Sequence, residues 1–370
     1  VDMLYATKDD QFSEGSESRN ENDVEMAANS EYHVDAMNKV GDILNEVVTI
    51  FAEAFPDVEI IISLGNNDVV PDYYLKLQDD TSDLDSLSSA DPIDYGMLGI
   101  MYNSLSSEGK EVSHDNNHNT SLGEQRRSRL LLSAKDKVTF VKGGYYSRQL
   151  SDSLTILSIN TVLYSSFYGP EPANSDDPGL QFAWMRQMLT NVLENGNSQA
   201  IIVGHIPPVM GSFRHTQLWR EKYINTYYGI VDEFDAVIVG QLFGHIHSDE
   251  FRVGVDESAI PSSLSTPLLL AGAITPLHGN NPSFRKVFYS SIDTSSNVNN
   301  STLLDYESHR YPMSDGDDGA WAKLYTFSEA YSFAADKISA EGLSANVFRS
   351  IIQSMVDERS EERRVGKECR

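Results

Sequence analysis

Imidazole and amide side chains follow three predicted strands of this 370-residue chain, each directly after the strand ends. The motifs, with the apolar run that each follows, are Gly65-Asn66-Asn67-Asp68 after 58–64, Gly204-His205 after 200–203, and Gly240-Gln-Leu-Phe-Gly-His245-Ile-His247 after 236–239. Loops beyond the carboxyl ends of strands converge on one crevice in open α/β sheets, and a glycine there lets the backbone turn sharply. Imidazole and oxygen ligands suit Zn²⁺, Fe or Mn²⁺. The three motifs together therefore predict a metal site.

Each motif also has an ordinary structural explanation. Gly-Asn-Asn-Asp is most often a tight turn, and a single histidine after a glycine is usually exposed or satisfied by a hydrogen bond. The pair His245 and His247 is the strongest single signal, because two imidazoles two residues apart serve little purpose without a ligand. His205 and His245 are 40 residues apart, which leaves room for the helix and the strand that a βαβ step requires. The order and spacing of the motifs therefore favour the metal site over three unrelated loops.

The elements that must position these motifs alternate along the chain. Apolar runs predict six strands, at 58–64, 154–159, 200–203, 236–239, 268–271 and 287–292. Helical spacing of apolar residues predicts helices at 35–55, near 95–105, at 177–196 and at 218–234, followed by two more at 321–333 and 343–355. Strands that alternate with helices are typical of an α/β layered fold.

Composition divides the chain into segments. We predict an acidic lead-in at 1–33, a main domain at 34–310 with an acidic insertion at 79–130, a helical C-terminal extension at 311–358 and a tail at 359–370. The tail resembles the translation of a common sequencing adapter, so we treat it as an artefact and leave it out of the fold prediction. It contains the one cysteine of the chain, Cys369, and the remainder therefore offers neither a disulfide framework nor a thiolate zinc site.

The charge of the chain restricts its partners. With 28 Lys and Arg against 55 Asp and Glu, the formal net charge is −27. Nucleic acids and anionic membrane surfaces bind basic patches, so we expect neither as a partner. The apolar runs are too short to span a bilayer, and the first residues, Val1-Asp2-Met3, do not begin a signal peptide. We therefore expect neither a transmembrane segment nor a signal peptide in this fragment.

Further motifs complete a recognisable pattern. They are Gly143-Gly-Tyr-Tyr146, Leu157-Ser-Ile-Asn-Thr161, Asp177-Pro-Gly-Leu-Gln-Phe-Ala-Trp184, Gly204-His-Ile-Pro-Pro208, the stretch 240–251, Thr275-Pro276 and Asn281-Pro-Ser-Phe-Arg285. With the helices around Trp321 and Tyr331, they resemble the calcineurin-like metallophosphoesterases, and more narrowly the acid sphingomyelinase-like phosphodiesterases and the related endopolyphosphatases. The resemblance covers 34–355 apart from the acidic insertion. It implies a layered α/β sandwich, with β-sheets flanked by helices, that is truncated at its N-terminus and carries a small helical C-terminal extension.

The resemblance also implies two divalent metal ions, for which we favour zinc over manganese or iron. In that pattern Asn66, His205 and His245 ligate one ion, and His247 ligates the other. A hydroxide that bridges the ions would attack the phosphorus of a phosphoester in line, with both ions offsetting the charge that develops on oxygen. The expected activity is therefore phosphoester hydrolysis of the sphingomyelin phosphodiesterase type.

Other residues take supporting parts in that pattern. Gln241 and Asp249 would lie behind the ligands and orient the imidazoles and the loop, although a plain solvated loop explains them equally well. His215 is a candidate for substrate binding, because it lies in the loop between two ligand positions. The other histidines, for which we expect no functional part, are His33, His114, His118, His278 and His309.

Asn67 and Asp68 form the predicted catalytic pair, and Asn67 departs from the sphingomyelinase pattern. The resemblance places a histidine at this position, where it would protonate the leaving group or stabilise the transition state. An asparagine can donate a hydrogen bond but cannot usefully transfer a proton. This favours an alternative, an endopolyphosphatase, because a phosphoanhydride leaving group needs less protonation. The net charge of −27 counts against polyanionic substrates.

A second departure concerns the start of the fold. The family begins with one strand that ends in Asp-x-His and another that ends in Gly-Asp. No Asp-x-His occurs in the chain, and Gly41-Asp42 lies inside a predicted helix. We therefore expect a fragment that binds metal poorly and hydrolyses little as it stands. The same departure supports a second alternative, a non-catalytic member, against which the retention of His205, His245 and His247 argues.

Partners and compartment follow from the resemblance alone. We expect a phosphoester substrate, with phospholipids among the candidates, and leave the oligomeric state open. The family implies a secreted, lysosomal or vacuolar glycoprotein. The sequons at Asn119, Asn299 and Asn300 fit that expectation, although three in a chain of this length are near chance. The lack of cysteine outside the tail departs from the disulfide-rich sphingomyelinases.

Overall fold

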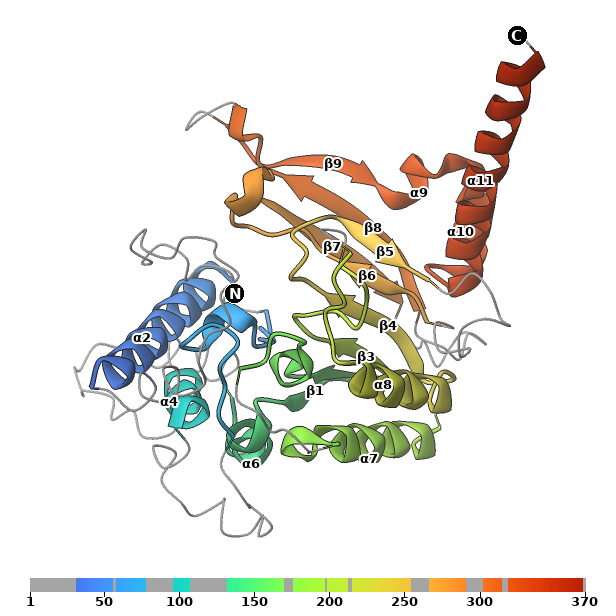
Figure 1. The fold of residues 1–370 in the computed structure, drawn as a ribbon. Coiled ribbons are helices and arrows are strands. Elements are labelled where there is room, and N and C mark those ends of the chain that lie inside the picture. Colours follow the sequence, from blue (N-terminus) through green and yellow to red (C-terminus); the bar gives the residue numbers. More distant parts are fainter. Residues whose placement is uncertain are drawn as a thin grey trace, which may run out of the picture. The chain divides into compact units, whose positions relative to one another are not determined.

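A computed structural model of the chain describes residues 31–55, 58–77, 96–106, 132–169, 176–196, 198–211, 215–253, 266–290, 302–314 and 319–368. Most of the predicted lead-in at 1–33 and of the acidic insertion at 79–130 lies outside these ranges. The chain divides into two compact units (Figure 1). Unit 1 comprises Val1–Arg148, Ser158–Gln181 and Gly204–Ile206, and unit 2 comprises Gln149–Leu157, Phe182–Val203 and Pro207–Arg370. The predicted domain limits at 310 and 358 stay predictions.

Unit 1 contains three helices and three short 3₁₀ turns within its described residues. They are α2 (Glu31–Ala54), η2 (Asn66–Asp68), α4 (Gly96–Leu105), α6 (Ala134–Gly143), η4 (Thr161–Tyr164) and η5 (Pro178–Leu180). The predicted helix at 35–55 is confirmed as α2, whose buried stripe Val40, Leu44, Val48 and Ala52 repeats every four residues. A Cβ at Gly41 would lie 2.8 Å from Ser104 Oγ of α4. Gly41-Asp42 lies inside a helix, as the sequence predicted, and Gly41 lies where α2 packs against α4.

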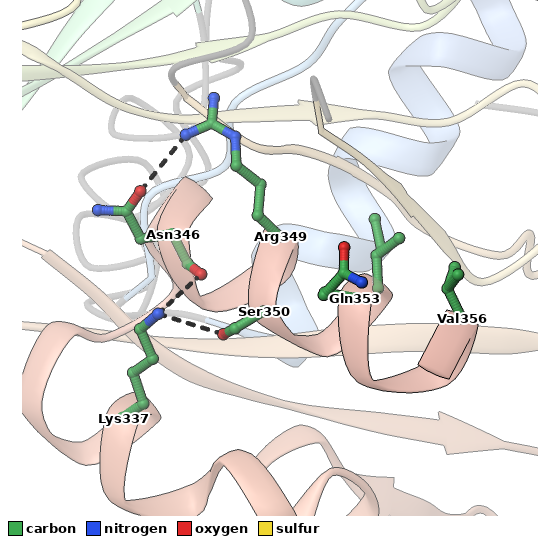
Figure 2. A pocket seen from close by; sticks show the side chains of 7 residues that line it. Lys337, Asn346, Arg349, Ser350, Gln353 and Val356 are labelled. Atoms are coloured by element: carbon green, nitrogen blue, oxygen red, sulfur yellow. Dashed lines mark hydrogen bonds between the residues drawn. The ribbon is translucent and has the colours of Figure 1, made fainter. Parts of the chain in front are cut away.

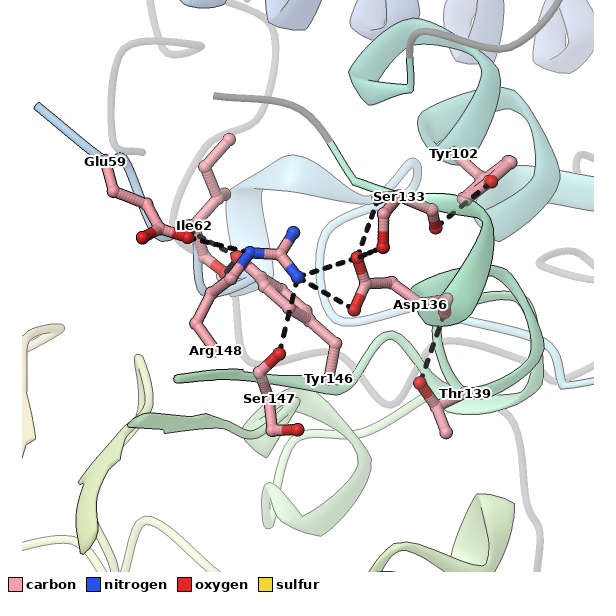
Figure 3. Close-up of polar contacts among 9 residues, drawn as sticks. All are labelled: Glu59, Ile62, Tyr102, Ser133, Asp136, Thr139, Tyr146, Ser147 and Arg148. Carbon is pink, nitrogen blue, oxygen red and sulfur yellow. Dashed lines mark hydrogen bonds and ion pairs between the residues drawn. The ribbon is translucent and has the colours of Figure 1, made fainter. Parts of the chain in front are cut away.

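An arginine ties the segments of unit 1 together at the start of α6. Asp136 caps this helix by accepting hydrogen bonds from the backbone N and the Oγ of Ser133, both at 2.7 Å. Arg148 donates to both oxygens of Asp136, at 2.8 and 3.0 Å, and pairs with Glu59 at 3.0 Å (Figure 3). The side chain of Arg148 is mostly buried, so these bonds hold the segment that precedes Asn66 against α6.

The predicted strand at 58–64 is wrong. The segment is extended, but among the described residues no strand pairs with it. Side-chain hydroxyls take the place of a ladder at Ile62, whose N–H donates to Tyr146 Oη at 2.7 Å and whose carbonyl accepts from Ser158 Oγ at 2.8 Å. Only Leu64 of this run is fully buried, and Val58 is exposed. A continuous apolar run does not by itself specify a strand, because the pairing of a strand depends on distant segments.

Unit 2 contains most of a mixed sheet with the strand order β1-β2-β3-β4-β6-β5. The first residues of β1 and the last residue of β2 belong to unit 1. The strands are β1 (Tyr146–Ser151), β2 (Leu154–Ser158), β3 (Gln199–Val203), β4 (Ile238–Phe243), β5 (Glu250–Arg252) and β6 (Leu268–Leu270). β3, β4 and β6 are parallel, and β5 is antiparallel to β6. The helices are α7 (Gln181–Glu194) and α8 (Glu221–Glu233), which meet at Phe182 and Tyr223. The α/β class is confirmed.

Strand β4 is longer than predicted at its C-terminal end. The sequence placed the strand at 236–239, with Gly240 and Gln241 beyond it, whereas β4 runs on to Phe243. Gly240 lies inside β4, and a Cβ there would be 2.5 Å from Leu303 Cδ1, so any side chain at this position requires Leu303 to shift. The turn that carries the histidines consequently begins at Gly244.

The C-terminal part of unit 2 combines a second sheet with helices. The antiparallel strands are β7 (Ser283–Ser290), β8 (Thr302–Arg310) and β9 (Ala322–Thr326), and the helices are α9 (Phe327–Ala330), α10 (Ala335–Glu341) and α11 (Ala345–Glu368). The predicted helix at 321–333 is wrong over 322–326, because this segment pairs with β8 as an edge strand. The predicted helix at 343–355 is confirmed as the first part of α11, which continues into the predicted tail at 359–370.

An open cavity of about 610 Å³ lies beside α11 (Figure 2). Its lining residues are Lys337, Asn346, Arg349, Ser350, Ile352, Gln353 and Val356. Lys337 Nζ donates to the carbonyl of Asn346 at 3.1 Å and to Ser350 Oγ at 3.3 Å, so it joins α10 to α11. No residue of the predicted site lines this cavity.

Candidate functional site

Asn66 and His205 face each other in unit 1. Asn66 Oδ1 and His205 Nε2 lie 3.1 Å apart, and both side chains are buried. The amide nitrogen of Asn66 donates to Asn67 Oδ1 at 3.2 Å and to Asp72 Oδ1 at 3.0 Å. These two bonds fix the amide so that its oxygen points toward the imidazole. Two of the predicted metal ligands are therefore brought together by a contact between side chains distant in sequence.

Gly65 and Asp68 shape the turn that carries Asn66. A Cβ at Gly65 would lie 3.1 Å from the ring of His205, so the absence of a side chain lets the imidazole approach. Asp68 is 1% exposed, and its Oδ2 accepts the backbone N–H of Gly65 at 2.8 Å. Asp68 thus closes the 3₁₀ turn on itself, and Asn67 lies half-buried within that turn.

The loop of His205 is held by polar contacts from the residues that follow β2. The backbone N–H of Ile206 donates to Thr161 Oγ1 at 2.7 Å. Asn160 and Gln181 support the same segment, because Asn160 N donates to Gln181 Oε1 at 2.7 Å and Gln181 Nε2 donates to Tyr164 Oη at 2.6 Å. Neutral hydrogen bonds between buried groups therefore define this part of the site.

His245 and His247 belong to unit 2 and have unusual backbone conformations. Their φ angles are 70° and 60°, in the left-handed region that non-glycine residues seldom occupy. The glycines of the motif were predicted to make the sharp turn, but the left-handed residues are the histidines themselves. Ile246 N donates to the carbonyl of Gly244 at 2.8 Å, and Asn280 Nδ2 donates to the carbonyl of His247 at 2.9 Å.

Gln241 and Asp249 were predicted to orient the imidazoles. Gln241 is fully buried, its Oε1 accepts from Tyr227 Oη at 2.7 Å, and its Nε2 donates to the carbonyl of Thr266 at 3.0 Å. Burial raises the pKa of Tyr227 well above its ordinary value, so the phenol keeps the proton that it donates. Both ends of the Gln241 amide thus connect β4 to its neighbours.

Asp249 makes its contacts with the second sheet. Its Oδ1 pairs with Arg285 of β7, and its Oδ2 accepts from Ser308 of β8. The carboxylate therefore anchors the end of the histidine loop, and its orienting role stays a prediction.

His278, for which the sequence predicted no functional part, lies beside His247. Its ring centroid lies 5.1 Å from that of His247, and the side chain is exposed. The signal was present in the Thr275-Pro276 motif, two residues before His278, which the sequence flagged without extending it to the histidine. The predicted substrate residue His215 is exposed, with a φ of 50°, and its role stays a prediction.

The donor set fits a metal site only in part. Asn66 Oδ1 and His205 Nε2, an amide oxygen and an imidazole nitrogen, lie 3.1 Å apart, and both are donor types that bind divalent ions. Within the described ranges, no three His, Cys, Asp or Glu side chains stand close enough together to hold an ion. His245 and His247 belong to the other unit, so their part as ligands stays a prediction.

Comparisons with known proteins agree with the motifs. The chain is 28% identical over 308 residues to a sphingomyelinase phosphodiesterase D of Dictyostelium discoideum, covering 83% of this chain and 59% of the relative. It is 26% identical to the mouse acid sphingomyelinase-like phosphodiesterase 3b, covering 80% of this chain and 58% of that protein. It is 30% identical to a rat cyclic GMP-AMP phosphodiesterase, covering 53% and 44%. The chain thus spans between two fifths and three fifths of the length of these relatives.

Other comparisons add little. No family model matches the chain. The solved structure of PhoD aligns with 79% of this chain and 73% of its own, at a TM-score of 0.31 and 9% identity, a likeness too weak to support an argument. Among the described helices none is long and apolar enough to cross a membrane. The predicted resemblance is confirmed, because the chain is similar in sequence to acid sphingomyelinase-like phosphodiesterases.

Proposed function

We propose that the chain forms part of a metal-dependent phosphodiesterase. The observation that carries the proposal is the pairing of Asn66 Oδ1 with His205 Nε2 at 3.1 Å, in a turn built to hold the amide in that orientation. The named relatives are phosphodiesterases, which favours this function over the endopolyphosphatase and non-catalytic alternatives.

The side chains divide the work in this proposal. Asn66 and His205 would hold one divalent cation, to which the sequence resemblance adds His245, and His247 would hold a second. Zinc is favoured because imidazole and amide oxygen dominate the donor set, with manganese and iron as alternatives. When bound, the cations supply Lewis-acid stabilisation of the phosphoryl oxygens. Asp68 keeps the turn closed, and Asn67 donates a hydrogen bond to a substrate oxygen without transferring a proton.

The absence of a proton donor at Asn67 favours substrates with a good leaving group. Relatives named for sphingomyelin and for cyclic GMP-AMP define the two substrate classes to test. From the family that the motifs resemble, we also propose a secreted, lysosomal or vacuolar compartment. The three sequons that would make the protein a glycoprotein, Asn119, Asn299 and Asn300, lie outside the described residues.

Two preparations test the proposal: the 370-residue chain and the product of the complete transcript. Metal content is measured by elemental analysis, and hydrolysis is followed with bis(p-nitrophenyl) phosphate, then sphingomyelin, cyclic GMP-AMP and polyphosphate. His205→Ala is expected to remove bound metal and to lower hydrolysis by at least about 100-fold, because a ligand is lost. His309→Gln is the matched control, since His309 stacks on Phe284 in the second sheet.

The outcome that contradicts the proposal is equally clear. If neither preparation holds a divalent ion or cleaves any of the four compounds, the chain is not a metallophosphodiesterase. If His205→Ala leaves metal content and rate unchanged, the Asn66–His205 pair is not the metal site.

A further inference from the structure

The loop that carries both histidines of unit 2 is conformationally costly. It spans residues 244–249, here called the imidazole loop, and contains His245 and His247 at φ angles of 70° and 60°. Such left-handed conformations persist only where the surrounding structure imposes them. Something outside the loop must therefore hold it.

Arg285 of β7 binds the C-terminal end of the imidazole loop. Its Nη2 pairs with Asp249 Oδ1 and donates to the carbonyl of Glu250 at 3.0 Å. Ser308 of β8 donates to the other oxygen of the Asp249 carboxylate. Two strands of the second sheet thus hold the last residue of the loop and the first residue of β5.

The guanidinium of Arg285 is buried at some cost. Its side chain is 4% exposed, and its Cζ lies 4.3 Å from the centre of the Tyr306 ring. Its Nε and Nη1 have no hydrogen-bond partner among the residues that the structure describes. An apolar residue of similar volume often serves stability equally well in place of a buried ion pair. The buried charge of Arg285 is therefore better explained by the position that it gives Asp249 than by a gain in stability.

We propose that Arg285 is a positioning residue, which holds the imidazole loop in the left-handed conformation that presents His245 and His247. This inference rests on the proposed function for its effect on catalysis. The contacts of Arg285 with Asp249 and Glu250 lie within unit 2, and their effect on the imidazole loop can be measured without any substrate.

The experiment compares Arg285→Met, Arg285→Lys and Asp249→Asn with the parent protein. The control is Arg252→Met, which removes an arginine paired with Glu250 in the same strand, where the arginine is 32% exposed. Amide hydrogen exchange is measured over 244–249, and the ¹⁵N signals of the imidazoles are recorded by NMR. Hydrolysis of bis(p-nitrophenyl) phosphate by the complete transcript product gives kcat and KM.

Arg285→Met is expected to speed amide exchange in the imidazole loop at least about tenfold, to shift the ring signals of His245 and His247, and to lower kcat on the order of 10- to 100-fold with KM nearly unchanged. Arg285→Lys should restore part of each effect, because an ammonium can pair with Asp249 without the fork that also reaches Glu250. Arg252→Met should change kcat by less than about twofold.

Each failure has its own signature. If the parent does not hydrolyse the probe but Arg285→Met still loosens the loop and shifts the rings, the proposed function fails and the positioning role stands. If the parent is active and Arg285→Met changes neither the amide exchange of the loop, nor the ring signals, nor kcat, the positioning role is overturned. Should Arg285→Met fail to fold, Asp249→Asn decides by the same three measurements, because it removes the charge and keeps the shape.

Discussion

The two regions that carry the predicted ligands are built by different means. Neither Asn66 nor His205 has a positive φ. The Asn66 amide donates hydrogen bonds to Asn67 and Asp72, and the N–H of Ile206, next to His205, donates to Thr161. The imidazole loop has two left-handed histidines and is held by a buried arginine. In the first region close packing sets the geometry, whereas in the second a buried ion pair holds a segment with left-handed residues. The two should therefore fail in different ways when perturbed.

The packing of the first region can be broken by one methyl group. In Gly65→Ala the new Cβ would lie 3.1 Å from the His205 ring, so the imidazole must move. We expect hydrolysis to fall on the order of 100-fold, because small displacements of reacting groups are costly. The rate with bis(p-nitrophenyl) phosphate is measured beside the melting temperature.

Gly229→Ala is the matched control for this change. A Cβ at Gly229, within α8, meets nothing within 4 Å. This variant should keep its rate and gain up to about 1 kcal/mol of stability from helix propensity. An active Gly65→Ala protein would show that the packing around His205 is looser than its distance indicates.

In the second region, substitution of His278 tests whether a further histidine takes part in the reaction. Its ring lies beside His247, with the centroids 5.1 Å apart, and its exposed side chain can donate a hydrogen bond to a phosphoryl oxygen. Loss of one hydrogen bond to a charged group costs about 1.5 kcal/mol or more, so His278→Ala should lower kcat/KM at least about tenfold. His309→Gln again serves as the control, and an unchanged kcat/KM in His278→Ala would leave His278 without a part in the reaction.

The smallest expected effect is the response of the first region to alkaline pH. Burial raises the pKa of Tyr146 to about 12, and its hydroxyl bonds both backbone groups of Ile62, four residues before Asn66. The unfolded phenol ionises near 10 while the folded one stays protonated, so this stabilisation is complete below pH 10 and is lost between pH 10 and 12. At pH 11 the loss is about 1.4 kcal/mol.

Urea unfolding of the parent and of Tyr146→Phe at pH 9 and pH 11 tests this effect. The variant lacks the titrating group, so its free energy of unfolding should fall less between the two pH values. Equal declines in the two proteins would show that Tyr146 does not carry the alkaline loss.

Local patterns predicted the elements whose burial repeats within one segment. The four-residue stripe of α2 and the apolar runs of β2, β3 and β6 needed no knowledge of distant residues. The segments 58–64 and 322–326 were predicted wrongly because pairing with a distant strand, or the lack of it, decided their structure. Contacts between distant residues also explain which site residues could not be predicted from the sequence.

Asn66 and His205 were predicted because each follows a hydrophobic segment in a motif. Arg285 and His278 were assigned no chemistry because their importance lies in contacts with Asp249 and His247, which spacing along the chain does not show. Residues that act by proximity alone need the fold before they can be recognised.

The missing side chain at Gly240 has a consequence for how such proteins diverge. Because a Cβ there would lie 2.5 Å from Leu303 Cδ1, an alanine at 240 requires the Leu303 side chain to shift or to be replaced by a smaller one. The two positions are therefore expected to covary between related sequences, with 240 changing seldom. A conserved glycine at the head of the histidine motif would then record the meeting of β4 with β8, and it would stay conserved even in lineages that have lost the chemistry.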